Sequence, residues 1–141
     1  MKMPREQAEA MLAHARDGYP FEVCGVLLGR AGERRVERIA RVANREQESP
    51  RVRYAIAPED QLRLQKEARG QGLEIVGFYH SHPDHPARPS ETDRRIAAEG
   101  LSDGVIHVVV GVAGGTEATP TAWVFRDGPQ AFEPEPLEID A

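Results

Sequence analysis

The apolar positions in the first part of the chain switch between helical and strand-like spacing. Residues 4–17 repeat apolar side chains every three or four positions, which predicts a helix. Residues 23–29 form a short continuous apolar run, typical of a strand buried on both faces. Residues 36–42 alternate, and a turn at 31–33 separates them from that run. The two segments therefore predict a hairpin.

A polar segment separates this hairpin from the middle of the chain. Residues 43–51 show no period, so we expect an exposed loop there that could contact a substrate. Residues 52–56 return to a strand pattern, and residues 58–70 open with acidic side chains and end at glycines, as a helix does. The apolar run 73–79 leads directly into two histidines. It places them at the carboxyl end of a central strand.

The remaining sequence predicts one more helix and further strands. The helix covers residues 90–100, a deeply buried strand covers 104–112, and another strand covers 121–125. The Pro-rich acidic end, 132–141, predicts an edge strand and a loose tail. This order of elements indicates an α/β or α+β fold, with a mixed β-sheet flanked by three helices in a single domain, residues 1–141.

Composition and charge exclude several classes of function. The chain of 141 residues has a net charge of −5 and its arginines are scattered among acidic residues, so nucleic acid is not an expected partner. No run approaches the ~20 apolar residues of a membrane span, so we expect a cytoplasmic protein with no membrane partner. Cys24 is the only cysteine, which leaves histidine and carboxylate to hold any metal. The oligomeric state, including a homodimer, is left open.

Most of the histidine lies within residues 79–93. Alternate residues of a strand point to the same side, so His80 and His82 can present two imidazoles together, with about 6–7 Å along the strand between them. Prolines then prevent a helix until Ser90, after which Ser90 and Asp93 fall on one face of a first helical turn. Two histidines and a carboxylate are a common ligand set of catalytic zinc, with water as the fourth ligand. The segment therefore predicts a metal site.

Each candidate residue also has another interpretation. Ser90 and Asp93 resemble a helix-capping box. His85 could replace Asp93 as the third ligand, although we favour a solvent-exposed role for it. Cys24 could act as a nucleophile with a histidine base, but a cysteine inside an apolar strand is usually a small buried hydrophobic residue. Glu22, just before the first buried strand, is either an exposed strand-end residue or a group that points into a site, and the pattern does not decide between them.

Together these residues resemble the JAMM, or MPN-plus, zinc metalloproteases, in particular their small stand-alone prokaryotic type. The family pattern is a glutamate in the first strand, then His-x-His-Pro, six residues, and Ser-x-x-Asp. The matching positions in this chain are Glu22, His80, His82, Pro83, Ser90 and Asp93. The resemblance overturns the interpretation of Ser90 and Asp93 as capping residues alone.

The resemblance implies a cytidine-deaminase-like mixed sheet and a zinc ion (Zn2+) held by His80, His82 and Asp93, with water as the fourth ligand. It also implies that Glu22 is the general base and acid and that Ser90 helps to hold the oxyanion. Family members cleave peptide or isopeptide bonds after the C-terminus of ubiquitin or ubiquitin-like proteins. For a chain this compact, the implied substrate is a ubiquitin-like or sulfur-carrier protein that ends in Gly-Gly.

Two other functions compete with the peptidase. Some MPN domains are non-catalytic protein-binding modules, but those have lost the metal ligands that this chain keeps. A zinc hydrolase of small molecules, such as a deaminase, would coordinate its zinc mainly through cysteines, and this chain has one cysteine. The sequence therefore favours the peptidase, and it leaves open the identity of the carrier and the choice between peptide and isopeptide bonds.

Overall fold

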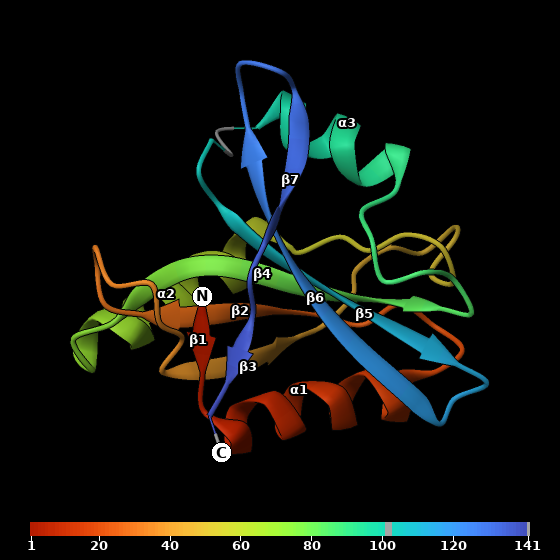
Figure 1. Cartoon of the computed structure of the whole chain (residues 1–141), viewed down its shortest axis with the longest axis horizontal. Coiled ribbons are helices and arrows are strands. Elements are labelled where there is room, and N and C mark those ends of the chain that lie inside the picture. Colours follow the sequence, from red (N-terminus) through yellow and green to blue (C-terminus); the bar gives the residue numbers. More distant parts are fainter. Residues whose placement is uncertain (101–102, 141) are drawn as a thin grey trace.

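The computed structural model describes residues 1–100 and 103–140, which form a twisted sheet with helices on its two faces (Figure 1). The helices of this described part are α1 (Arg5–Gly18), α2 (Pro58–Gly70) and α3 (Glu91–Glu99). Its strands are β1 (Lys2–Met3), β2 (Cys24–Gly29), β3 (Arg38–Val42), β4 (Glu74–Pro83), β5 (Ile106–Ala113), β6 (Glu117–Arg126), β7 (Ala131–Glu135) and β8 (Glu138–Ile139). None of the helices in these ranges has the length and hydropathy needed to cross a membrane.

The main sheet is mixed, as the order of elements predicts. Its strands lie in the order β3-β2-β4-β5-β6-β7. Strands β4 and β5 run parallel, whereas every other neighbouring pair is antiparallel. The strand that carries the two histidines, β4, is therefore central, with β2 on one side and β5 on the other.

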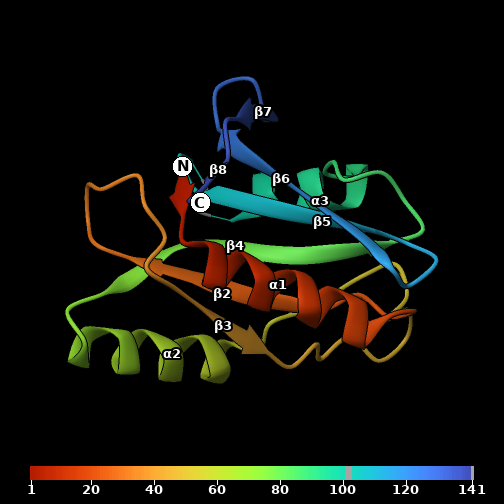
Figure 2. The same cartoon turned by 60° about the horizontal axis from the view of Figure 1, so that its bottom comes forward.

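Two hydrophobic cores lie on opposite faces of this sheet. Helix α1 covers one face (Figure 2). There its Met11 packs with Leu27 and Tyr79. Helix α2 covers the other face, where Leu64 packs with Val26. Because successive strand residues point to opposite faces, the fully buried strand β2 contributes to both cores. This confirms the prediction that residues 23–29 form a strand buried on both sides.

The segment 52–56 forms no strand, so the sequence prediction for it is wrong. Its backbone N–H and C=O groups form hydrogen bonds with the preceding loop instead. The Asn44 side chain donates to the Arg53 carbonyl at 3.1 Å and accepts from the Ala55 N–H at 3.0 Å, and the Arg45 N–H donates to the Ala55 carbonyl at 2.9 Å. A side chain here replaces a neighbouring strand as hydrogen-bond partner. Residues 44–55 therefore form a closed loop.

The C-terminal segment is also more ordered than the sequence predicts. Strand β7 lies at the edge of the sheet, as expected. Beyond it, β8 pairs in parallel with β1, so the two chain ends lie side by side (Figure 1). The Met1 ammonium group donates to Glu135 at 3.1 Å and to the Pro136 carbonyl at 2.9 Å. The described part of the tail is thus held in place by pairing and charge, in contrast to the expected loose end, while Ala141 lies outside the described residues.

Candidate metal centre

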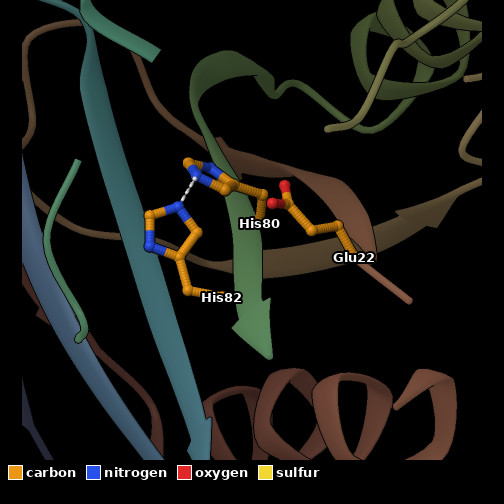
Figure 3. Close-up of side chains that lie close together, drawn as sticks. All are labelled: Glu22, His80 and His82. Carbon is orange, nitrogen blue, oxygen red and sulfur yellow. Dashed lines mark hydrogen bonds between the residues drawn. The ribbon is translucent and has the colours of Figure 1, made fainter. Parts of the chain in front are cut away.

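Strand β4 brings His80 and His82 together near its carboxyl end. Both side chains point to the face that α2 covers. Tyr79, between Phe78 and His80 in sequence, points to the face of α1, where its hydroxyl group forms a hydrogen bond of 2.7 Å with His14 Nδ1. The two Nε2 atoms lie 3.1 Å apart (Figure 3). Both histidines are buried, with 2% and 6% of their surface exposed. The alternation of the strand thus gathers the two imidazoles on one side, as the sequence predicts.

Asp93, from the first turn of α3, joins the pair. Its Oδ2 atom lies 3.1 Å from Nε2 of His80 and 3.1 Å from Nε2 of His82. The three atoms therefore form a triangle with equal edges of 3.1 Å. Tetrahedral zinc, with bonds of about 2.0–2.2 Å, separates its ligand atoms by about 3.3–3.6 Å. The donor set and its spacing therefore fit one face of a zinc coordination shell.

The charges of these groups also suit a cation. Burial lowers the pKa of His80, which keeps its imidazole neutral. Burial alone would raise the pKa of Asp93, but its contacts with His80 and His82 outweigh burial and lower that pKa, so the carboxylate stays ionised. Burial would lower the pKa of His82, but the hydrogen bond to Asp93, the charge of Asp93 and the contact with the Pro86 carbonyl together outweigh burial and raise that pKa. A metal ion would therefore compete with a proton at His82.

The two imidazoles are oriented in different ways. His82 Nδ1 lies 3.1 Å from the Pro86 carbonyl, a hydrogen bond that fixes its ring and leaves Nε2 for the metal. The ring of His80 stacks on Tyr54, with centroids 4.6 Å apart and an angle of 23° between the rings. Among the described residues, His80 Nδ1 has no hydrogen-bond partner. Stacking on Tyr54 therefore orients the His80 ring together with the Nε2 contacts to His82 and Asp93.

Glu22 lies two residues before the start of β2, and its side chain points into the same site. One of its carboxylate oxygens and a nitrogen of each histidine all lie within 4.8 Å of one another (Figure 3). Only 6% of Glu22 is exposed, and Oε1 has no partner among the described residues. Burial, with a smaller effect of the Asp93 charge, raises the pKa of Glu22 to about 8. A buried carboxyl group with a pKa near neutral is suited to proton transfer.

Ser90 caps helix α3 and also reaches the site. Its Oγ accepts from the Asp93 N–H at 3.0 Å, and its own N–H donates to Asp93 Oδ2 at 2.8 Å, so the capping box that the sequence resembles is present. The Oγ acts there as an acceptor and keeps its hydroxyl proton. Ser90 also lines a cavity of about 410 Å³ together with Glu22 and His82. Its capping contact therefore leaves a hydroxyl donor beside the metal-binding atoms.

Cys24 and His85 do not join this cluster. Cys24 is fully buried, its Sγ lies 3.6 Å from the Val42 carbonyl, and burial raises its pKa to about 12. Such a thiol is a poor nucleophile. His85 is exposed in the turn after β4, where it lines the cavity beside Glu22. Both residues thus have the roles that we favour from the sequence.

Two residues that position the site escape the sequence analysis. The Asn44 amide donates to the carbonyl of Glu22 at 3.0 Å, in addition to its bonds with the loop that carries Tyr54. The Ser81 hydroxyl accepts from the Val23 N–H at 2.9 Å, next to Glu22. Only two weak signals mark them: a lone asparagine in a polar loop, and a small polar residue between two histidines. Both contacts fix the backbone around Glu22.

Comparisons with known proteins agree with this geometry. Residues 4–126, which include every candidate site residue, match the Prok-JAB family, the prokaryotic homologs of the JAB domain. The chain is 38% identical over 102 residues to the desampylase of Haloferax volcanii, covering 70% of this chain and 73% of that protein. It is 40% identical over 90 residues to the CysO-cysteine peptidase of Mycobacterium tuberculosis, covering 64% of this chain and 60% of that protein.

A solved structure resembles the whole described fold. The solution structure of a protein from Desulfitobacterium hafniense superimposes with a TM-score of 0.85 and 31% sequence identity. The superposition covers 99% of this chain and 93% of that one. The family match and this similarity extend over most of the sequence. The chain therefore belongs to the prokaryotic homologs of the JAB domain, the small prokaryotic type of the JAMM family.

Proposed function

We propose that this protein is a zinc metallopeptidase that cleaves the bond after the C-terminal Gly-Gly of a ubiquitin-like or sulfur-carrier protein. The observation that carries the proposal is the triangle of donor atoms from His80, His82 and Asp93, with Glu22 beside it. The substrate class rests on the relatives, of which one is named a desampylase and one a CysO-cysteine peptidase. These names motivate the choice of a carrier protein as the test substrate.

In this proposal His80, His82 and Asp93 hold the zinc ion. When bound, zinc polarises a carbonyl group and lowers the pKa of a water molecule to about 7. Glu22 takes a proton from the attacking water and passes it to the leaving amine, a role worth ~10²–10⁴ in rate. Its buried position and raised pKa suit a group that must hold the proton between these two steps.

Ser90 has the second catalytic role in this proposal. As the carbonyl carbon becomes tetrahedral, its oxygen gains negative charge. The Ser90 hydroxyl, which only accepts a hydrogen bond within the helix cap, is free to donate to that oxygen. The loss of one such donor typically lowers kcat by about 10²–10³.

The space around the cluster supports an extended substrate. One cavity of about 410 Å³ reaches the cluster through Glu22 and His82. A second, equally large cavity reaches it through Asp93 and Tyr54, and this one has apolar walls that include Phe78. A polypeptide can therefore continue in both directions from a bond held at the metal-binding atoms.

The test is cleavage of a defined carrier. The zinc-loaded protein is incubated with a ubiquitin-like carrier whose Gly-Gly end is extended by a few residues, and mass spectrometry locates the cut. We expect cleavage after Gly-Gly, slowed ~10²–10⁴-fold by Glu22→Gln. The exposed loop substitution Glu48→Gln serves as the matched control and should leave the rate unchanged. Failure of the zinc-loaded protein to cut would favour the non-catalytic binding module instead. Equal cutting by Glu22→Gln would overturn the role of Glu22 as general base.

A further inference from the structure

Two arginines face the cavity that contains Glu22. Arg53 belongs to the closed loop 44–55, and Arg88 belongs to the Pro-rich turn between β4 and α3. Both therefore line the same space as the catalytic candidates, from two different segments of the chain. Glu22 is the only carboxylate among the residues that line this cavity.

Neither arginine forms an ion pair with a residue of the described part of the chain. Other arginines near the site are paired, as Arg45 is with Asp60 and Arg94 with Glu91. Among the ion pairs within residues 1–100 and 103–140, none involves Arg53 or Arg88. In a chain of net charge −5, the cavity is thus lined by two arginines that form no ion pair with a described residue.

The backbone under each arginine is fixed. The Arg53 carbonyl accepts the hydrogen bond from Asn44 at 3.1 Å. The Arg88 N–H donates to the Pro86 carbonyl at 2.8 Å, and the carbonyl of the adjacent Ala87 accepts from the Thr121 hydroxyl. Both arginines are exposed residues, so their side chains can meet a ligand without breaking an ion pair, while their points of attachment stay in place.

The proposed mechanism says which part of a substrate enters this cavity. Glu22 delivers its proton to the leaving amine, so that amine must lie on the side of Glu22. In a leaving group that is a single amino acid, a free α-carboxylate is attached one carbon away from that amine. When the leaving amine is the ε-amine of a lysine in another protein, no carboxylate lies so close. Guanidinium groups bind carboxylates with paired, charge-assisted hydrogen bonds.

We propose that Arg53 and Arg88 form a recognition site for the α-carboxylate of the leaving group. The preferred substrate is then a carrier that ends in Gly-Gly followed by one amino acid. Water adds to the glycine carbonyl, the C–N bond breaks, and the free amino acid leaves with the proton from Glu22. This inference rests on the proposed peptidase function and adds a preference for a peptide bond over an isopeptide bond.

The test compares four carriers that differ only after Gly-Gly. They end in alanine with a free carboxylate, in alaninamide, in aspartic acid amide, or in an isopeptide bond to lysine in a peptide. We expect the free acid to have a kcat/KM on the order of 10–100-fold above the others. Arg53→Ala and Arg88→Ala should each lower kcat/KM for the free acid and so remove most of its preference over the alaninamide, while the exposed Arg30→Ala control should keep that preference.

The outcomes separate the inference from the function on which it rests. If every carrier is cut at the same rate, the function stands and the carboxylate site is wrong. If the aspartic acid amide matches the free acid, the α-carboxylate assignment is wrong. If no carrier is cut, the proposed function fails; binding of the free acid and the alaninamide to the Glu22→Gln protein, measured by calorimetry, then still decides the inference. Equal affinities for those two carriers would overturn it.

Discussion

The two halves of this candidate active site are built in different ways. The ligand half consists of His80, His82, Ser90 and Asp93, which lie within one short segment where a central strand ends and a helix begins. The base half consists of Glu22 and the closed loop 44–55, which come from the first part of the chain. The sheet and the helix cap shape the ligand half, whereas a few hydrogen bonds from single side chains hold the base half.

This difference predicts different responses to substitution. Loss of any of the three proposed metal ligands, His80, His82 or Asp93, should remove the metal and with it all activity. Damage to the base half should lower the rate while the metal stays bound. The residue Tyr54 joins the two halves, because it belongs to the loop but stacks on the His80 ring. It should therefore show an intermediate response.

The largest effect is expected for His82→Ala. This change removes one of three donor atoms and leaves the other two 3.1 Å apart. We expect loss of bound zinc, measured by elemental analysis, and loss of detectable cleavage. His85→Ala is the matched control, since this exposed histidine contributes no donor atom to the triangle and the substitution keeps its N–H, which donates to the His82 carbonyl at 3.4 Å. A His82→Ala protein that keeps zinc and activity would contradict the ligand assignment.

Asn44→Asp tests the base half. The change keeps the acceptor oxygen and removes the amide that donates to Glu22 and Arg53. Because a displacement of about 1 Å at a catalytic group can cost ~10²-fold, we expect kcat to fall by ~10–100-fold with zinc content unchanged. Gln47→Glu makes the same chemical change at an exposed position of the same loop and should have no effect. Loss of zinc with Asn44→Asp would show that the two halves are not separable.

Tyr54→Ala tests the contact that joins the two halves of the site. Loss of the stacking partner should free the His80 ring and weaken zinc binding about 10-fold, as the loss of a residue that orients a metal ligand typically does. Tyr54→Phe keeps the ring and should bind zinc like the unmodified protein. Titration with a competing chelator measures both. Equal zinc affinity of Tyr54→Ala and Tyr54→Phe would mean that stacking does not orient His80.

The ligand half could be predicted from the sequence because local geometry dictates it. Strand alternation places His80 and His82 on one side, and the first turn of a helix presents Ser90 and Asp93 together. The base half could not be predicted in this way. Its hydrogen bonds from Asn44 join backbone groups far apart in the chain and leave no periodic pattern in residues 43–51.

Two features of the base half misled or limited the sequence analysis. The alternation of residues 52–56 is typical of a strand, yet their hydrogen bonds go to Asn44 and Arg45 rather than to another strand. The direction of Glu22 depends on the pairing of β2 with β4, which places Cys24 opposite His80. Only the resemblance to a family connected Glu22 with the histidines before the fold was known.

The smallest effect expected concerns stability without metal. Burial raises the pKa of Glu22 from 4.5 to about 8 in the folded protein. The folded protein then keeps a proton that the unfolded chain releases, so this residue makes stability fall as pH rises from about 4.5 to about 8. In Glu22→Gln that contribution disappears. Urea unfolding of the metal-free proteins at pH 5 and pH 8 measures this. Between these two pH values the free energy of unfolding should fall further in the unmodified protein than in Glu22→Gln, by on the order of 2–4 kcal/mol.

The control for this measurement is Glu48→Gln, an exposed residue whose change should leave the pH dependence as it is. The raised pKa of His82 acts in the same direction, but it is present in both proteins and largely cancels in the comparison. Parallel pH profiles of the unmodified protein and Glu22→Gln would show that Glu22 does not sit in the buried position described above.

The most direct test of the central claim is X-ray absorption at the zinc edge of the metal-loaded protein. The triangle formed by His80, His82 and Asp93 predicts two imidazole nitrogens and two oxygens, at about 2.0–2.2 Å. A sulfur at about 2.3 Å would point to Cys24 as a ligand. A sulfur shell, or a third imidazole from His85, would contradict the account.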